Sequence, residues 1–204
     1  LATHTSSIID SEVYDRESYV LFENKGSSDE DAVHVPDNFN VSTDKMAMSA
    51  FLKAVLTKSG KWYTEDSFLD KKPGSFFEYS NVGATLAAAV LEYATGESYD
   101  AFTTKYILQP LKMNASGWAF ETVDMAMHST QYLNPETVLA KYSLITYPDG
   151  GLITSSHDLG LYLSELIKGY SGEGTILNDE SYKTLFTQQL DASHFEERDT
   201  DNPY

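Results

Sequence analysis

The chain has 204 residues and a formal net charge of −17, and this acidity argues against nucleic acid or an anionic membrane as a partner. Hydrophobic residues make up 41% of the chain and charged residues 22%, which is enough for a packed core in one domain. The absence of cysteine excludes disulfides, a thiol nucleophile and a thiolate metal site. The longest apolar run, residues 86–91, is too short to cross a bilayer. No signal peptide is visible, and Leu1 is interpreted as an internal start.

The spacing of apolar and capping residues predicts a mainly helical chain. We expect a short helix within residues 10–24, then an acidic surface loop inserted at 25–37. Further helices are expected over residues 44–58, 82–95, 99–108, from Ser155 onward and from Asn178 onward. Residues 121–149 show little periodicity and are predicted to be mostly irregular.

Apolar stripes on these helices predict which side chains enter the core. The stripe residues are Met48, Phe51, Leu52, Val55 and Leu56 in the first long helix; Val82, Leu86, Ala89, Val90 and Tyr93 in the second; Phe102, Tyr106 and Ile107 in the third; Leu159, Leu163, Leu166 and Ile167 in the fourth; and Tyr182, Leu185 and Phe186 in the last.

Residues 73–81 (Pro-Gly-Ser-Phe-Phe-Glu-Tyr-Ser-Asn) are the stretch with the clearest functional signal. Pro73-Gly74 is typical of a turn, and Tyr79 and Asn81 follow where a loop enters a buried helix. There, a phenol and an amide can be held rigidly and still face a cleft. The simpler interpretation is that Ser80 or Asn81 only caps the helix.

Three hydroxyl–lysine patterns resemble catalytic motifs and are interpreted as coincidental. Residues 42–45 (Ser-Thr-Asp-Lys) match the Ser-x-x-Lys spacing, which places a serine nucleophile and a lysine on one helical face. A helix cap followed by a solvated lysine is the better explanation, because an acid intervenes and no glycine or aromatic packing shields the pair. Lys183-Thr184 continues into a helical stripe, and residues 200–202 (Thr-Asp-Asn) lie in an acidic tail.

No cofactor or metal site is predicted. The five histidines are scattered along the chain, without the paired spacing that zinc sites usually show. Gly172-Glu173-Gly174 lacks the preceding strand that a phosphate-binding loop would have.

Four blocks, taken in order, resemble the serine β-lactamase-like hydrolases, which include class C β-lactamases, DD-peptidases, D-aminopeptidases and related esterases. Residues 1–8 (Leu-Ala-Thr-His-Thr-Ser-Ser-Ile) resemble the family's Leu-Leu-Thr-His-Thr-Ser-Gly-Ile, and residues 73–81 resemble its Pro-Gly…Tyr-Ser-Asn. Residues 109–118 resemble its Pro-Leu-Gly-Met…Thr-Gly element. Residues 150–159 resemble its Gly-Gly-Leu-x-Ser-Thr-x-x-Asp-Leu element.

The resemblance implies that Tyr79 is the tyrosine that exchanges a proton with a serine nucleophile. A phenol serves this role when nearby cations lower its pKa from about 10. Asn81 would orient the amide or carbonyl of a β-lactam, D-amino-acid peptide or ester substrate. The family's fold implies that the chain is mainly α, an α+β fragment.

The chain also departs from the family pattern, with Ser7 in place of a glycine. The family's Ser-x-x-Lys would lie upstream of Leu1, and its Lys-Thr-Gly or His-x-Gly strand would lie beyond Tyr204. We therefore expect residues 1–190 to be the helical domain, 191–204 to be an acidic tail or linker, and the antiparallel sheet domain to be largely missing. The missing sheet domain would be the partner of this chain, and the 204 residues alone should hydrolyse nothing.

Two other interpretations remain open. The chain could be a non-catalytic, β-lactamase-like binding module that uses the face a sheet domain would cover. It could also be an acidic helical scaffold with accidental motifs, which would bury Tyr79. A periplasmic or secreted location is implied by the family resemblance alone.

Overall fold

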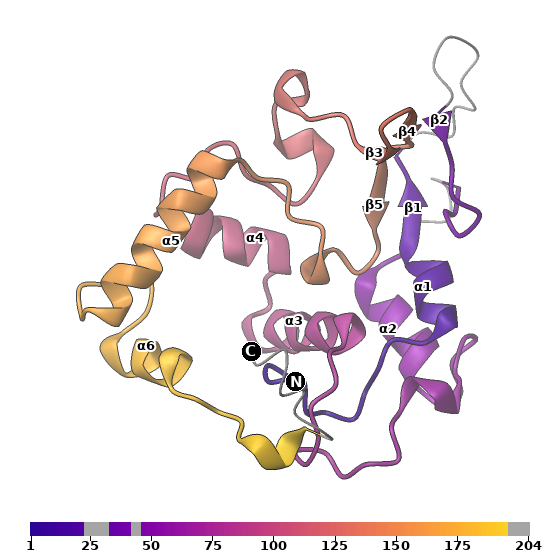
Figure 1. Cartoon of the computed structure of the whole chain (residues 1–204), viewed down its shortest axis with the longest axis horizontal. Helices are drawn as coiled ribbons and strands as arrows, with labels where there is room; N and C mark the ends of the chain where they lie inside the picture. The colour runs from indigo at the N-terminus through magenta and orange to yellow at the C-terminus, as the bar shows by residue number, and fades with distance from the viewer. Residues whose placement is uncertain (23–32, 42–45, 196–204) are drawn as a thin grey trace.

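A computed structural model describes residues 1–22, 33–41 and 46–195 (Figure 1). Its helices are α1 (Glu12–Ser18), α2 (Met48–Leu56), α3 (Asn81–Thr95), α4 (Tyr99–Thr103), α5 (Ser156–Tyr170) and α6 (Asp179–Phe186). Its strands are β1 (Tyr19–Leu21), β2 (Val33–His34), β3 (Tyr132–Asn134), β4 (Thr137–Leu139) and β5 (Tyr142–Leu144). In this view helices α1 to α3 lie below the β1–β5 pair, whereas α5 and α6 lie on the left side of the molecule.

The strands form two small sheets, and β3, β4 and β5 fall in residues 121–149, which the sequence predicted to be mostly irregular. β1 pairs antiparallel with β5, so that Tyr19 lies opposite Leu144. In the other sheet β4 is central, parallel to β2 and antiparallel to β3. The prediction was wrong for residues 132–144 because strands of three residues are too short to show a period of two. β2 also falls inside the predicted 25–37 loop, of which residues 25–32 lie outside the described part.

The core forms where α1, α2 and α3 meet. Phe51, Val55 and Val82 are fully buried, and Ile8, Leu56 and Leu86 pack against them. The predicted stripe of α2 is therefore confirmed, although this helix starts at Met48 rather than at residue 44. The predicted caps Ser42 and Thr43 lie outside the described residues.

Capping residues lie where predicted at both ends of α3 and at the starts of α5 and α6. The Ser80 side chain accepts the Gly83 N–H at the start of α3, and Gly96, with φ of 73°, ends this helix. A left-handed residue directly after a helix is usually glycine because a Cβ would clash there. Ser155 caps α5 and Asn178 caps α6 in the same way as Ser80.

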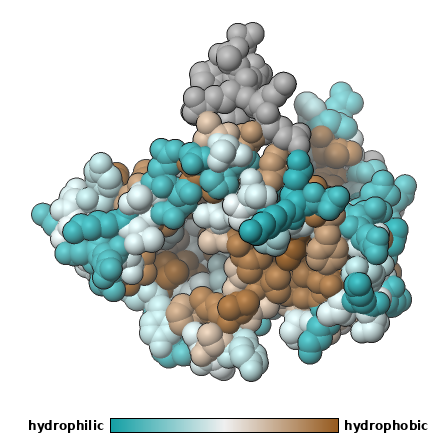
Figure 2. Space-filling model, turned by 90° about the horizontal axis from the view of Figure 1, so that it is seen from below, coloured by the Kyte–Doolittle hydropathy of each residue, from teal (hydrophilic) through white to brown (hydrophobic). Residues whose placement is uncertain are grey.

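Large parts of the predicted stripes on α3 and α5 are exposed, which corrects the expectation that they are core. On α3, Val90 is 56% exposed and Tyr93 94% exposed. Along α5, three of its four stripe residues are exposed: Leu159, Leu163 and Ile167. Leu185, Phe186 and Tyr106, also predicted to be core, are exposed too. Figure 2 shows hydrophobic residues gathered over the middle of the face seen from below.

A buried carboxylate joins α5 to α6. Glu165 accepts hydrogen bonds from the Tyr182 hydroxyl, at 2.7 Å, and from the backbone N–H groups of Ile176, at 2.9 Å, and Thr175. Burial opposes the ionisation of Glu165, but these hydrogen bonds outweigh it and lower its pKa. The Tyr182 ring packs on Gly169, where an added Cβ would lie 2.2 Å from the ring.

This contact predicts opposite effects for two substitutions in α5. Gly169→Ala should lower the free energy of unfolding by about 1–3 kcal/mol, because Tyr182 cannot move away without leaving Glu165. Gly160→Ala is the matched control, since a Cβ there meets nothing within 4 Å; it should raise stability by about 0.5–1 kcal/mol. Urea denaturation measures both. Equal effects of the two changes would contradict this account of the α5–α6 contact.

Lys112, which follows the helix predicted over residues 99–108, has a strained backbone conformation. Its φ is 60°, in the left-handed region that costs most residues about 1–2 kcal/mol. In the sequence resemblance, this position aligns with the glycine of Pro-Leu-Gly-Met. The structure therefore supplies a physical reason for a glycine at this position.

Replacing Lys112 by glycine should stabilise the protein by about 1 kcal/mol, because glycine adopts positive φ without a Cβ clash. Lys112→Ala removes the same exposed side chain but keeps the Cβ, and it should bring no such gain. Thermal unfolding followed by circular dichroism would compare the two variants. A melting temperature that rises as much in the alanine variant would show that the lysine side chain, not the backbone, is responsible.

Within residues 1–22, 33–41 and 46–195, no helix combines the length and the apolar character needed to cross a membrane.

Candidate active site

Tyr79 lies on the surface just before α3, and its side chain is 56% exposed. Its hydroxyl donates a hydrogen bond to Asn81 Oδ1 at 2.9 Å. The phenol oxygen keeps its lone pairs available, so it can also accept a hydrogen bond from a group that approaches from solvent. An acidic scaffold with accidental motifs would bury Tyr79, so this exposure argues against that interpretation.

Asp10 holds the first residues of α3. Its carboxylate accepts the Asn81 and Val82 backbone N–H groups, at 3.0 and 2.9 Å, and the Ser80 hydroxyl, at 3.2 Å. It also accepts the Asn81 side-chain amide at 2.8 Å. The Asn81 amide nitrogen is thus directed at Asp10 and its oxygen at Tyr79, which fixes the orientation of the amide. A carboxylate at this end also complements the helix dipole.

Sequence reasoning missed Asp10 because it lies 70 residues before Ser80. The helix-start signals that can be read from a sequence are local ones, such as the Ser80 side chain. The only indication in the sequence is that Asp10 follows the Thr-His-Thr-Ser block by a few residues.

Two of the four family-like blocks meet at Tyr79. The Gly74 N–H donates to Thr5 O at 2.6 Å, and the Glu78 N–H donates to His4 O at 2.9 Å. The His4 side chain accepts the Ser80 N–H at Nδ1, at 3.1 Å. Residues 1–8 therefore support the loop that carries Tyr79.

Ser7 stands where the resemblance places a glycine, and its φ is 62°. Its hydroxyl donates to Lys71 O at 2.8 Å. This bond offsets part of the cost of a left-handed backbone. The hydrogen bond of Ser7 therefore compensates in part for the backbone strain that a glycine at this position would avoid.

The other two blocks bind each other. Gly117 and Ile153 exchange backbone hydrogen bonds, each of 2.9 Å. The buried Asp158 carboxylate accepts the Ala115 N–H at 2.8 Å and the Ser116 hydroxyl at 2.7 Å. These hydrogen bonds connect the start of α5 to the loop after α4. The Asp158 carboxylate and the Gly117–Ile153 pair are thus used for contacts within the protein.

A third carboxylate, Asp149, lies in a turn that contacts α3. It accepts hydrogen bonds from the Thr85 hydroxyl, at 2.8 Å, and from the Tyr14 hydroxyl. Burial raises the pKa of Asp149, while these two hydrogen bonds oppose the rise. Burial also raises the pKa of Tyr14. The cluster joins α1, α3 and the turn at residues 147–149.

One of the three hydroxyl–lysine patterns lies in the described part of the chain. Lys183 and Thr184 are exposed on α6, where the Thr184 hydroxyl donates to Glu180 O at 3.0 Å. Residues 42–45 and 200–202 lie outside the described residues. Among the described residues, no group of three or more His, Asp or Glu side chains is arranged to hold a metal ion.

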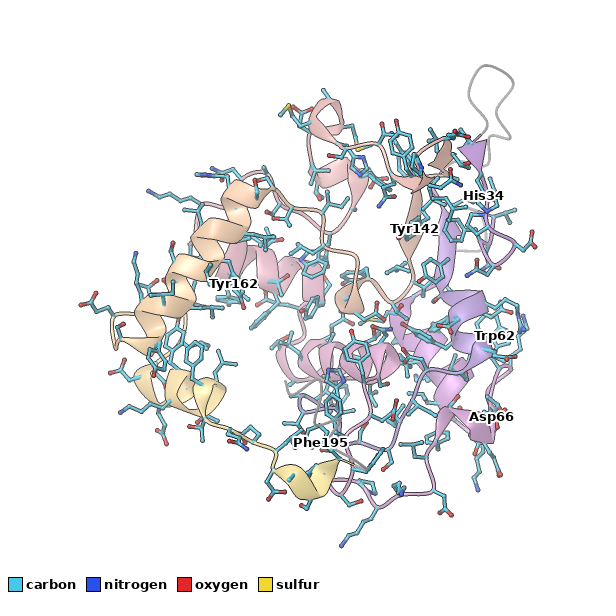
Figure 3. All side chains as sticks on the ribbon, in the orientation of Figure 1. His34, Trp62, Asp66, Tyr142, Tyr162 and Phe195 are labelled. Atoms are coloured by element: carbon cyan, nitrogen blue, oxygen red, sulfur yellow. The ribbon has the colours of Figure 1, made fainter. Side chains whose placement is uncertain are left out.

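The described part of the predicted acidic tail lies beside the candidate site. The Phe77 N–H donates to His194 O at 2.8 Å, and the Phe77 and Phe195 rings lie 5.3 Å apart. Figure 3 shows Phe195 below α3. Residues 191–195 therefore pack against the loop that carries Tyr79.

The arrangement predicts that Asp10→Asn will destabilise the protein and loosen Asn81. An amide presents N–H groups where the carboxylate accepts donors on both oxygens, so we expect a loss of about 2–3 kcal/mol in the free energy of unfolding. The control is Asp15→Asn, which removes the same charge from the exposed face of α1. Chemical denaturation measures both variants; equal stabilities would contradict the role assigned to Asp10.

The β-lactamase family sequence model matches residues 21–203 of this chain. The curated Protein flp of Staphylococcus aureus (strain MW2) is 28% identical over 95 residues, which cover 45% of this chain and 19% of that protein.

Solved structures of the same fold are similar over almost the whole chain. A penicillin-binding protein from Bacillus halodurans has a TM-score of 0.57 and 19% identity, over 93% of this chain and 50% of its own. A D-stereospecific amidohydrolase from Streptomyces sp. has a TM-score of 0.52 and 20% identity, over 93% and 51%. A class C β-lactamase has a TM-score of 0.52 and 19% identity, over 90% and 40%. The chain spans about half the length of these structures, whose fold it shares. By its sequence match and its fold, the chain belongs to the β-lactamase family.

Proposed function

We propose that this chain is the Tyr-x-Asn-bearing part of a serine hydrolase that works through an acyl-enzyme. The observation that carries the proposal is the exposed Tyr79 hydroxyl, bonded to an Asn81 amide that Asp10 holds in place. A proton-accepting phenol and an oriented amide at the surface are the groups that acyl transfer needs beside a nucleophile.

In this mechanism a serine attacks the substrate carbonyl, and Tyr79 accepts the serine proton and returns it to the leaving group. Asn81 orients the substrate amide or carbonyl. A phenol with a pKa near 10 needs a neighbouring cation to act as a base at neutral pH. We place the serine and the lysine that meet this need in a Ser-x-x-Lys motif on a preceding segment of a longer polypeptide.

The uncovered apolar surface supports a neighbouring domain as the partner. Helix α3 carries one charged side chain, Glu92, among its 15 residues. A helix that is apolar nearly all round is normally buried on all sides. Since Val90 and the α5 stripe are exposed here, we propose that residues 1–190 are the helical domain and that a sheet domain of the same protein covers this surface.

The substrate classes proposed are β-lactams, D-amino-acid peptides and simple esters. The similar structures include one described as a D-stereospecific amidohydrolase and one described as a class C β-lactamase, and each of these names fits acyl transfer. A protein acting on such substrates would work in the periplasm or outside the cell, and we propose one of these locations.

A non-catalytic binding module is the second candidate. The same exposed apolar residues favour it, because patches of this kind promote association. The two candidates make different predictions for Tyr79, because only the hydrolase uses its phenol to transfer a proton.

The first test is labelling by a fluorescent penicillin and a fluorophosphonate on the protein made from the complete reading frame. Tyr79→Phe should slow covalent labelling by about 10²–10⁴-fold, the usual effect of losing a general base. Tyr93→Phe, which alters a 94% exposed tyrosine near the other end of α3, should label at the rate of the unaltered protein. The 204 residues alone should not be labelled.

Three outcomes would contradict the proposal. Equal labelling rates in the two tyrosine variants would remove Tyr79 from the reaction. Labelling of the isolated 204 residues would show that the nucleophile lies within them. A folded complete protein that reacts with neither probe would favour the binding module.

A further inference from the structure

We propose that His4 is a positioning residue for Tyr79, and that its imidazole does this in the neutral form that carries its proton on Nε2. This inference rests on the proposed function of Tyr79. His4 itself reacts with nothing; it holds the segment on which the phenol is mounted.

The hydrogen bond at Nδ1 defines the form of the ring. The Ser80 N–H is a donor that cannot accept, and it lies 3.1 Å from His4 Nδ1. Nδ1 must therefore offer a lone pair, which places the proton of the neutral imidazole on Nε2. A proton on Nδ1 would bring two donors together and break this contact.

His4 binds the chain on both sides of Tyr79. Its backbone oxygen accepts the Glu78 N–H at 2.9 Å, and its ring accepts the Ser80 N–H. The residues directly before and after the tyrosine are thus fixed by one residue from a distant part of the chain. The backbone of Tyr79 cannot rotate without breaking one of these two bonds.

The imidazole also limits where the phenol ring can lie. The His4 and Tyr79 ring centroids are 4.6 Å apart with 31° between the planes, and the Phe77 ring meets the imidazole edge-on at 6.0 Å and 77°. One face of the phenol is therefore occupied by His4. The Tyr79 hydroxyl is left in reach of Asn81 Oδ1, which it contacts at 2.9 Å.

The backbone of His4 is strained in the way that is common at functional sites. Its φ is 52°, in the left-handed region where histidine and asparagine are enriched among residues other than glycine. This conformation lets the backbone oxygen and the side chain of the same residue both reach the Tyr79 segment. A glycine would accept the φ value but would supply no side-chain acceptor.

Two substitutions separate the acceptor from the ring. His4→Asn keeps an acceptor atom two bonds from Cβ and a residue type that tolerates positive φ, but it removes the ring. His4→Phe keeps a ring against Tyr79 but leaves the Ser80 N–H without its acceptor. Asp15→Asn serves as the unrelated control.

The measurements on this chain do not depend on activity. Nitrogen NMR of the unaltered protein at neutral pH should show His4 protonated at Nε2 and not at Nδ1. Amide hydrogen exchange of Ser80 should be about tenfold faster in His4→Phe, which is the effect of losing one hydrogen bond, and close to its original rate in His4→Asn. The Tyr79 ring resonances should shift and broaden in His4→Asn, because the stacked ring is gone.

The rates of covalent labelling are measured on the protein made from the complete reading frame. In both His4 variants the maximal rate of labelling should fall about tenfold, while the probe concentration that gives half-maximal labelling should stay within about twofold. A proton on Nδ1 of His4, or unchanged Ser80 exchange in His4→Phe, would overturn the positioning role. If these structural results hold but Tyr79→Phe labels normally, the proposed function fails and the role of His4 in holding this segment stands.

Discussion

The arrangement of the candidate site depends on one carboxylate, Asp10, at the start of α3. Its oxygens accept donors from three consecutive residues, Ser80, Asn81 and Val82. Charge-assisted hydrogen bonds of this kind are among the strongest that a protein forms. By accepting the unpaired N–H groups at the start of α3, Asp10 fixes the direction in which the chain enters the helix. That direction decides where Tyr79 and Asn81 point.

The family-like blocks gain a physical meaning from this geometry. Residues 1–8 and 73–81 are far apart in sequence, yet they exchange hydrogen bonds around Tyr79. Residues 109–118 and 150–159 are joined by Asp158 and by the Gly117–Ile153 pair. Most residues in these blocks therefore fasten loops to one another. Tyr79 differs from them in being exposed, with its hydroxyl at the surface.

Local signals allowed much of the helical structure to be predicted. Ser80, Gly96, Ser155 and Asn178 mark helix ends because capping involves only neighbouring residues. The short strands and Asp10 could not be found in this way, since both depend on contacts between distant segments. The apolar stripe of α5 was predicted correctly as a pattern, but its burial was not. A pattern shows that a face is apolar; whether something covers that face depends on the rest of the protein.

The central claim is that Tyr79 exchanges a proton with a serine nucleophile. The most direct test is a crystal structure of the protein made from the complete reading frame, acylated by a penicillin or a fluorophosphonate. The account predicts the Tyr79 hydroxyl within hydrogen-bonding distance, about 2.6–3.2 Å, of the oxygen of the modified serine, with Asn81 still bonded to Asp10. A modified residue that lies out of reach of Tyr79 would contradict it.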